Sequence, residues 1–418
     1  MRRSDILQGR AATSNEARAE MISKALIDRL FGAASIQRWN DHVRPVELTE
    51  LDKQAHKAFI MFLLAKFEED RQPNPPLDWA FLIDGLIFEL LPRVVLTDIK
   101  APFFHRLMKT HGDKVNRYVL KELEPELEWM GDFHTRLAAY LNGDREGSLE
   151  RRILKAAHYL ATQWEFRLVY HSGPFLYDID KTRAGIENQL EDYIDLLGVR
   201  KISLKQKAYG FVDLCGQLRF QQRWAQTPRM PSTSVLGHSL FTAVLTYLFE
   251  TGRGFCPARR RNNFLGALMH DLPEVFTRDI ISPVKRSFEE LEKFVEQEER
   301  FLVRDSLLPL LPDTWHDQMI YFIEKPFENR IRENGERRTV TLEELDATYN
   351  TDAFDGVDGA LIKSCDLLSA MIEAGKSIEI GIGSPALRAG VKQIMKDRQK
   401  KTDNSVPLDY FEMYKPAG

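Results

Sequence analysis

The sequence predicts an all-α protein built from two tandem helical bundles. Apolar residues recur at three- and four-residue spacing along most of the chain, and alternating β-patterns bounded by hairpin turns are nearly absent. Three blocks of sequence also appear twice in the same order. The first two observations are typical of helices with a buried face, and the third indicates an internal duplication.

The helical periodicity is clearest in nine segments. In each of them the apolar positions fall on one face of a helix with 3.6 residues per turn. We expect helices at residues 53–68, 79–91, 150–168, 183–197, 206–224, 238–250, 262–270, 287–303 and 359–374.

Two stretches interrupt the periodicity. Residues 171–182 contain a Gly-Pro pair, which separates helical blocks. Residues 331–359 are polar and acidic, and we expect a long loop there that is a lid, a binding loop or a disordered segment. The predicted organisation is an N-terminal tail (1–20), a first helical domain (21–180), a connecting helix or linker (181–205), a second helical domain (206–396) and a loosely attached C-terminal tail (397–418).

The composition is that of an ordinary globular protein. Of the 418 residues, 43% are hydrophobic and 29% are charged, and the formal net charge is −4. These values do not indicate nucleic acid or an acidic membrane surface as the main partner. The sequence has no apolar run of about 18 residues, no secretory signal and no disulfide framework, because its three cysteines are widely spaced. We therefore expect a reduced, cytoplasmic protein.

The repeat consists of three blocks in a common order. Residues 86–102 resemble 268–283, Gln-Arg-Trp occurs at 37–39 and at 222–224, and 153–165 resemble 361–373. We interpret the blocks as two diverged copies of one helical domain. The copies differ at polar positions: Glu89 and Leu90 replace His270 and Asp271, Arg93 replaces Glu274, and His158 replaces Asp366.

Four polar residues of the second copy interrupt apolar helical stripes, namely His238, His270, Asp271 and Asp366. A buried carboxylate needs a partner, and a cation is a strong candidate. Two imidazoles and two carboxylates without a thiolate suit one divalent ion (Mn, Co, Mg, Fe or Zn) in a catalytic rather than a structural site. Since leucine cannot ligate a metal, we expect the first copy to have lost its site and kept its fold.

Simpler interpretations of these residues stay open. His238 alone would more often be a core histidine than a ligand. A second dipeptide, His316-Asp317, lacks the Leu-Pro-Glu that follows His270-Asp271, and we expect it to be an exposed pair on a helix.

The ordered pattern His … His-Asp … Asp, with HDLPEVFTRDIISPVK around the dyad, resembles the HD-domain metal-dependent phosphohydrolases. The resemblance covers roughly residues 206–385 and is strongest to the branch that contains bacterial 5′-deoxynucleotidases. It implies two tandem HD-domain-like bundles, of which the N-terminal one is degenerate. The residues that carry it are Arg223-Trp224, His238-Ser239, His270-Asp271, Glu274, Asp279 and Pro283-Val284-Lys285.

The resemblance implies a role for each remaining position. Glu274 would orient or deprotonate the attacking water, and Asp279 would lie beside the substrate, where it would assist the leaving group or contact the sugar. Arg223 would bind the phosphate, and Trp224 would pack against the ribose or help to exclude a 2′-hydroxyl. Without the resemblance, two simpler interpretations stay open. Glu274 could be a carboxylate at the start of a helix, and Arg223 and Trp224 could be an ordinary surface pair.

Three departures from the family pattern concern the substrate. Gly237 stands where the nucleotidase pattern usually has Glu, and Arg278 replaces a glycine, which brings a cationic side chain to the edge of the site as a further substrate contact. The segment 331–359 has no counterpart in short family members. These differences indicate a larger or more highly charged substrate.

The leading hypothesis is a 5′-nucleotidase that acts on (deoxy)nucleoside monophosphates. A dNTP triphosphohydrolase or a nucleotide second-messenger phosphodiesterase is the alternative enzyme, with Arg278, Lys285 and Arg286 as the added basic residues. A di-iron oxygenase is disfavoured because His316 is the only histidine between the dyad and Asp366. A non-catalytic protein that binds a nucleotide or a partner is the alternative of another class.

The degenerate copy suggests how the chain assembles. It would fill the place of a second subunit, which gives a monomeric pseudo-dimer, while a homodimer stays an alternative. Another interpretation is that the first copy binds an effector, with Arg38 and Arg93 as anion contacts.

Overall fold

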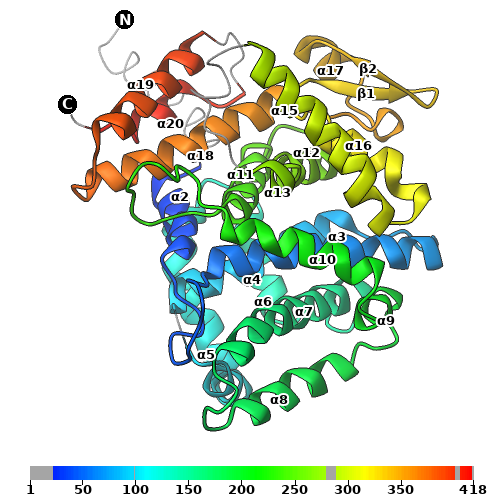
Figure 1. The fold of residues 1–418 in the computed structure, drawn as a ribbon, viewed down its shortest axis with the longest axis vertical. Helices are drawn as coiled ribbons and strands as arrows, with labels where there is room; N and C mark the ends of the chain where they lie inside the picture. Colours follow the sequence, from blue (N-terminus) through cyan, green and yellow to red (C-terminus); the bar gives the residue numbers. More distant parts are fainter. Residues whose placement is uncertain (1–21, 98, 279–288, 401–404, 417–418) are drawn as a thin grey trace, which may run out of the picture.

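The structure is a computed structural model that describes residues 22–97, 99–278, 289–400 and 405–416. Helices dominate these residues, and the sheet found among them is a two-stranded hairpin (Figure 1), which confirms the all-α fold. The helices before residue 206 are α2 (Lys24–Phe31), α3 (Glu50–Arg71), α4 (Trp79–Leu96), α5 (Ala101–Leu127), α6 (Phe133–Leu141), α7 (Leu149–Ser172), α8 (Ile179–Glu191) and α9 (Leu197–Ser203).

The C-terminal half adds further helices and the hairpin. Its helices are α10 (Lys207–Gln217), α11 (Val235–Phe249), α12 (Pro257–Met269), α13 (Glu274–Thr277), α15 (Glu289–Leu302), α16 (His316–Ile323), α17 (Leu342–Ala347), α18 (Gly359–Glu379), α19 (Pro385–Gln399) and α20 (Leu408–Glu412). The strands are β1 (Arg330–Glu333) and β2 (Glu336–Thr339).

The nine expected helices correspond to α3, α4, α7, α8, α10, α11, α12, α15 and α18. The periodicity missed α2, α5, α6, α9, α13, α16, α17, α19 and α20, of which α5 and α19 are the longest. Helix α5 alternates short apolar groups with charged residues and is kinked at His111, where φ is −138°. A long helix that is mostly exposed along one side gives a weak periodic signal, because few of its positions must be apolar.

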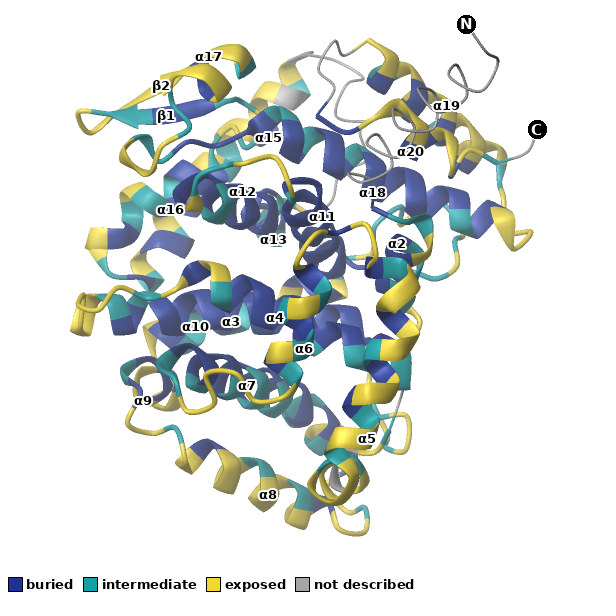
Figure 2. Cartoon of the chain, turned by 180° about the vertical axis from the view of Figure 1, so that it is seen from behind, coloured by how far each residue is buried: buried dark blue, intermediate teal, exposed yellow. Residues whose placement is uncertain are grey.

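A continuous hydrophobic core unites the two halves of the chain. Buried side chains of α3, α4 and α7 are in contact with those of α11, α12 and α18, and Figure 2 shows the buried residues running through the middle of the molecule. Every residue of α11 is buried. A helix that is apolar all round must be covered on every side by other elements. Helix α3 of the N-terminal half covers one side of α11.

The contact between α3 and α11 explains Gly237. A Cβ atom at this position would lie 2.8 Å from Oδ1 of Asp52 and 3.2 Å from Cδ2 of Leu51. Asp52 is buried and accepts a 2.5 Å hydrogen bond from the hydroxyl of Ser234, the N-cap of α11. The glycine is therefore required because α3 fills the space that a glutamate side chain would need.

The two Gln-Arg-Trp segments adopt the same local structure. Gln37 forms an antiparallel bridge with Thr49, and Gln222 forms one with Ser234. Thr49 and Ser234 are then the N-caps of α3 and α11. The tryptophans that end the two segments both have positive φ, 54° at Trp39 and 58° at Trp224.

The segment 331–359 is folded, which corrects the expectation of a long loop. It forms the β1–β2 hairpin, the short helix α17 and a small core of Ile331, Val340 and Leu345. Asn334 and Gly335 connect the strands, and both have positive φ (53° and 82°). An Asn-Gly pair is the strongest sequence signal for such a turn, so the hairpin was predictable.

The expectation of a loosely attached C-terminal tail is wrong for residues 405–416. Helix α19 continues to Gln399, and α20 packs onto the start of the described chain. The hydroxyl of Tyr410 donates to the carbonyl of Ile22 (3.0 Å), and that of Tyr414 donates to Asp28 (2.9 Å). Burial of these aromatic rings anchors the end of the chain.

Among the described helices, none combines the length and the apolar character that crossing a membrane requires.

We expect the Gly237→Ala substitution to destabilise the protein by about 1–3 kcal/mol, because an added methyl group in a filled contact forces its neighbours to shift. Gly185→Ala is the matched control. Gly185 is exposed in α8 with no atom within 4 Å of an added Cβ, and alanine there should stabilise by roughly 0.5–1 kcal/mol. Urea denaturation of the three proteins measures both effects. Equal stability of the two variants would contradict the close contact between α3 and α11.

Candidate metal centre

Four side chains predicted as metal ligands converge where three helices meet. His238 lies on α11, His270 and Asp271 follow the end of α12, and Asp366 lies on α18. Ligand atoms of His238, His270 and Asp366 all lie within 4.8 Å of one another. Nε2 of His238 is 3.0 Å from Oδ1 of Asp366, and Nε2 of His270 is 3.2 Å from Oδ2 of Asp271. Oδ2 of Asp271 also lies 3.9 Å from Nε2 of His238.

The side chains around the imidazoles hold Nε2 of each ring toward this point. Nδ1 of His270 lies 2.7 Å from the carbonyl oxygen of Ala267 and must donate to it, because a carbonyl only accepts. Nδ1 of His238 lies 3.3 Å from Oε1 of Glu373. Burial and a neighbouring guanidinium lower the pKa of His238, but hydrogen bonds to Asp366 and Glu373 outweigh them and raise it to about 9. A partner on Nδ1 that leaves Nε2 for the ion is typical of metal-binding histidines.

The buried polar atoms of the site fit a divalent ion. Nε2 of His270 and Oδ2 of Asp271 are buried, and neither makes a hydrogen bond of acceptable geometry to any described residue. Leaving such atoms unsatisfied costs roughly 1–3 kcal/mol each. Imidazole nitrogen and carboxylate oxygen are the donors that Mn, Fe, Co and Zn accept. A cation between Nε2 of His270 and Oδ2 of Asp271 would therefore be coordinated by two atoms that the protein leaves without a hydrogen bond.

Positive groups keep both carboxylates ionised. Burial would raise the pKa of Asp366, but Lys363, whose Nζ lies 2.7 Å from Oδ2, and the hydrogen bond to His238 hold that pKa well below its usual range. Burial likewise opposes ionisation of Asp271, and His270 outweighs it and lowers the pKa. Both aspartates are thus in the form that binds a metal.

Glu373 is a functional residue that the sequence interpretation missed. It is 1% exposed, and its carboxylate accepts hydrogen bonds from the indole of Trp224 (2.9 Å) and the hydroxyl of Thr233 (2.8 Å) besides facing His238. Nε of Arg223 lies 4.0 Å away. The signal was its spacing: Glu373 follows Asp366 by two helical turns and so lies on the same face of α18.

The Arg-Trp pair borders the site. Nη1 of Arg223 lies 3.5 Å from Oδ2 of Asp271, which places the guanidinium beside the predicted ligands. The ring of Trp224 packs on Gly390 of α19, where a Cβ atom would lie 2.6 Å from the indole. The indole N–H is engaged by Glu373. In this structure Trp224 therefore holds the carboxylate of Glu373, which in turn faces His238. Contact of Trp224 with a ribose stays a prediction.

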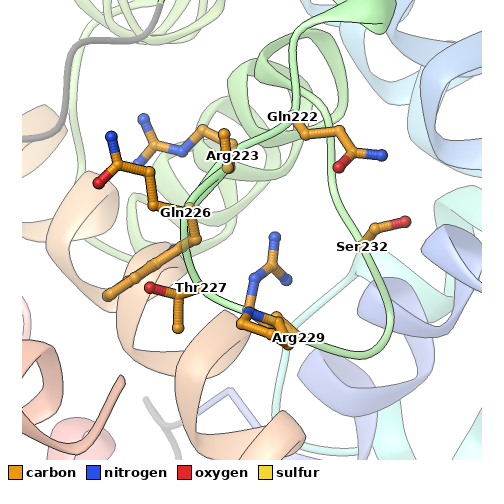
Figure 3. A pocket seen from close by; sticks show the side chains of 9 residues that line it. Gln222, Arg223, Gln226, Thr227, Arg229 and Ser232 are labelled. Carbon is orange, nitrogen blue, oxygen red and sulfur yellow. The ribbon is translucent and has the colours of Figure 1, made fainter. Parts of the chain in front are cut away.

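A hollow of about 300 Å³ lies within the loop that contains the Arg-Trp pair, lined by residues 222–229 and Ser232. Figure 3 shows the side chain of Arg229 reaching into the ring of this loop. Its guanidinium donates to the carbonyl of Pro231 (2.7 Å) and to the hydroxyl of Thr233 (2.6 Å). Arg229 therefore fixes the loop and, through Thr233, the carboxylate of Glu373.

The remaining predicted positions lie after the dyad. Glu274 is buried and is the first residue of α13, one turn beyond His270. Arg278 is exposed at the end of α13 with φ of 67°. Asp279, Lys285 and Arg286 lie outside the described residues, so their roles stay predictions.

The second dipeptide belongs to the surface. The side chain of Asp317 is 68% exposed and pairs with Arg332 and Arg337 of the hairpin at 2.7 Å each. His316 lies at the start of α16 with Nε2 3.3 Å from the carbonyl oxygen of Leu311. The expectation of an exposed pair on a helix therefore holds for Asp317, whereas His316 is half-buried.

We expect Glu373→Gln to weaken divalent metal binding by roughly 10- to 100-fold, because a neutral amide no longer holds the imidazole of His238 as a carboxylate does. Isothermal titration with Mn²⁺ or Co²⁺ measures the dissociation constant. Glu379→Gln, on the same helix with a side chain that is 60% exposed, is the control and should bind as the wild type does. Unchanged affinity of a folded Glu373→Gln protein would remove its role at the site.

Comparison with known proteins addresses the segment that holds these residues. Residues 215–395 match a family model described as an HD domain, and the match includes α11, α12 and α18 with all four predicted ligands. No curated protein matches the chain. The match supports an HD domain over residues 215–395, of the superfamily of metal-dependent phosphohydrolases.

Proposed function

We propose that the chain is a phosphohydrolase that removes the phosphate from nucleotides, and that its preferred substrates are (deoxy)nucleoside 5′-monophosphates. The observation that carries the proposal is the convergence of His238, His270, Asp271 and Asp366 within the matched segment. The Arg-Trp pair before His238, which borders the site, supports the nucleotidase branch.

The residues of the site have complementary tasks in this reaction. A bound divalent ion would acidify a water molecule and neutralise phosphoryl oxygens. Arg223 offers a planar pair of N–H groups that matches two phosphate oxygens. Glu274, buried one turn after the dyad, is the proposed acceptor of the proton from the attacking water. Asp279 is proposed to act on the leaving group or the sugar, and Arg278 to contact a further negative charge.

Two enzyme alternatives and one non-enzyme alternative remain. A dNTP triphosphohydrolase or a second-messenger phosphodiesterase would use the same centre with a substrate of higher charge. The folded insertion of residues 331–359 and the exposed Arg278 favour a substrate beyond the smallest monophosphates. A nucleotide-binding protein without activity would leave the centre intact and show no turnover.

We further propose that the N-terminal half is a copy of the same domain that has lost its metal site, so that the chain is an internal pseudo-dimer. Support comes from matching contacts. The indoles of Trp39 and Trp224 donate to Glu165 of α7 and Glu373 of α18, respectively. Each glutamate also lies near the arginine that precedes its tryptophan in the sequence. Nε of Arg38 is 2.9 Å from Oε2 of Glu165, and Nε of Arg223 is 4.0 Å from Oε2 of Glu373.

In the proposed correspondence Lys53 is the counterpart of His238, since each is the fourth residue after the N-cap of its helix. Nζ of Lys53 lies 2.6 Å from Nδ1 of His158, the counterpart of Asp366. Nearby, Lys57 donates to Glu89, the counterpart of His270, at 2.6 Å. Side chains of the protein itself thus fill the place that a metal would take.

We expect His270→Ala/Asp271→Ala to lower the rate of hydrolysis of a nucleoside monophosphate by more than about 100-fold. Loss of a residue that only orients a ligand typically costs roughly 10- to 100-fold, and loss of two ligands should cost more. Phosphate release is measured with Mn²⁺, Co²⁺ and Mg²⁺ over mono-, tri- and cyclic nucleotides. His316→Ala/Asp317→Ala is the matched control, because it removes a dyad of the same two residue types that pairs with the hairpin instead of the predicted metal centre.

Equal turnover by the two double variants would contradict the mechanism. Turnover of triphosphates or cyclic nucleotides alone would move the assignment to the alternative enzymes. No turnover of any nucleotide by the metal-loaded wild type would favour the binding protein.

A further inference from the structure

We propose that Phe327 and Lys363 form a substrate-binding wall beside the metal centre, on which Phe327 stacks against a flat aromatic group, such as a nucleobase, while Lys363 contacts the phosphate. This inference rests on the proposed function and names the part of the substrate that the site recognises.

Phe327 lies directly against the predicted metal ligands. It belongs to the loop between α16 and β1, and its ring centroid is 5.9 Å from that of His270, with the planes inclined by 58°. The residue is 36% exposed. A phenylalanine that leaves more than a third of its surface in water gives up part of the free energy of burial. Beside a polar centre, such a ring offers an apolar surface to a ligand.

Lys363 lies between this ring and the centre. Its Nζ is 4.1 Å from the centroid of Phe327 and 2.7 Å from Oδ2 of Asp366. An ion at the centre would compete for Asp366 and repel the ammonium group. Lys363 would then be free to bind an anion next to the ion, and a phosphate bound to the ion is that anion.

The backbone that carries Phe327 is anchored rigidly. A Cβ atom on Gly359 would lie 2.4 Å from the carbonyl carbon of Phe327 and 2.5 Å from the backbone of Glu328, so the loop rests on the first turn of α18. The side chain of Asn329 accepts a 2.9 Å hydrogen bond from the N–H of Ala360. Phe327 and Lys363 are therefore held by the same helix end.

A buried arginine fixes the loop from the other side. Arg330 is 5% exposed, and its guanidinium donates to the carbonyls of Tyr321 (2.7 Å), Lys325 (2.9 Å) and Glu328 (2.9 Å). The backbone of Arg330 also forms two hydrogen bonds with that of Val357 (3.0 and 2.8 Å). A loop whose backbone is held in this way loses little conformational entropy when a ligand stacks on its side chain.

The combination of groups defines the class of ligand. The ammonium of Lys363 and the guanidinium of Arg223 both contact ligand carboxylates of the centre and suit a phosphate bound there. An aromatic ring within a few ångströms of a phosphate site suits a phosphate ester with a planar, apolar group. A nucleoside phosphate has both parts, whereas a sugar phosphate or free phosphate has only the first.

The test is binding of a nucleoside 5′-methylenephosphonate, which has no ester bond to hydrolyse, compared with inorganic phosphate on the Mn²⁺-loaded protein by calorimetry. Phe327→Ala should weaken binding of the nucleoside phosphonate by roughly 5- to 100-fold and leave phosphate binding unchanged. Phe327→Trp should retain nucleoside affinity. Lys363→Met should weaken binding of both probes.

Phe301→Ala is the matched control, because Phe301 is 59% exposed on α15, and it should bind both probes as the wild type does. Wild-type affinity of Phe327→Ala for the nucleoside phosphonate, equal loss for both probes, or no binding of the nucleoside phosphonate by the wild type would overturn the inference. Its failure is separate from that of the proposed function. Hydrolysis of nucleotides with unchanged binding by Phe327→Ala refutes the wall alone, whereas the expected binding pattern without any hydrolysis refutes the proposed reaction alone.

Discussion

Asp271 and Asp366 bring two negative charges close together in the helical core of the C-terminal half, and much of the surrounding structure serves to hold them there. Like charges repel strongly where water is excluded, so such a pair needs positive charge between or around it. His238 and Lys363 partly provide this charge in the structure. The hydrogen-bonding capacity that remains at Nε2 of His270 and Oδ2 of Asp271 is suited to a divalent ion.

The proposed N-terminal copy meets the same packing problem with different residues. The bridge, the N-cap and the Trp–Glu hydrogen bond occur in both halves, so the same kinds of contact hold the helices together in each. At the polar centre, an amine–imidazole contact between Lys53 and His158 takes the place of ligands. Helix α3 has a structural role whether or not the halves are copies, because it covers the fully buried α11 and forces glycine at position 237.

Residue patterns predict the fold class and the helices with a buried face because burial imposes its period on the sequence, whereas the longest described helix, α5, was missed because much of it is exposed. The convergence of His238, His270, Asp271 and Asp366 was likewise predictable, since four polar residues in apolar helices have few explanations other than a shared partner. Glu373 was not predicted, because a single glutamate in a helix usually faces water. Its spacing from Asp366 was the available signal, and the contact with His238 shows which side chain it holds. Phe327 carries no local signal, because its place beside His270 depends on the packing of a loop onto Gly359, far along the chain.

The metal content of the full-length protein tests the account most directly. After loading with Mn²⁺ or Co²⁺ and removal of free ion, elemental analysis should find one ion per chain in the wild type and almost none in Asp366→Asn/His270→Ala. Substitution of Lys53, whose place corresponds to that of His238 in the proposed N-terminal copy, should leave this ratio at one. A metal-free wild type, or full retention of the ion by the double variant, would contradict a metal centre at His238, His270, Asp271 and Asp366.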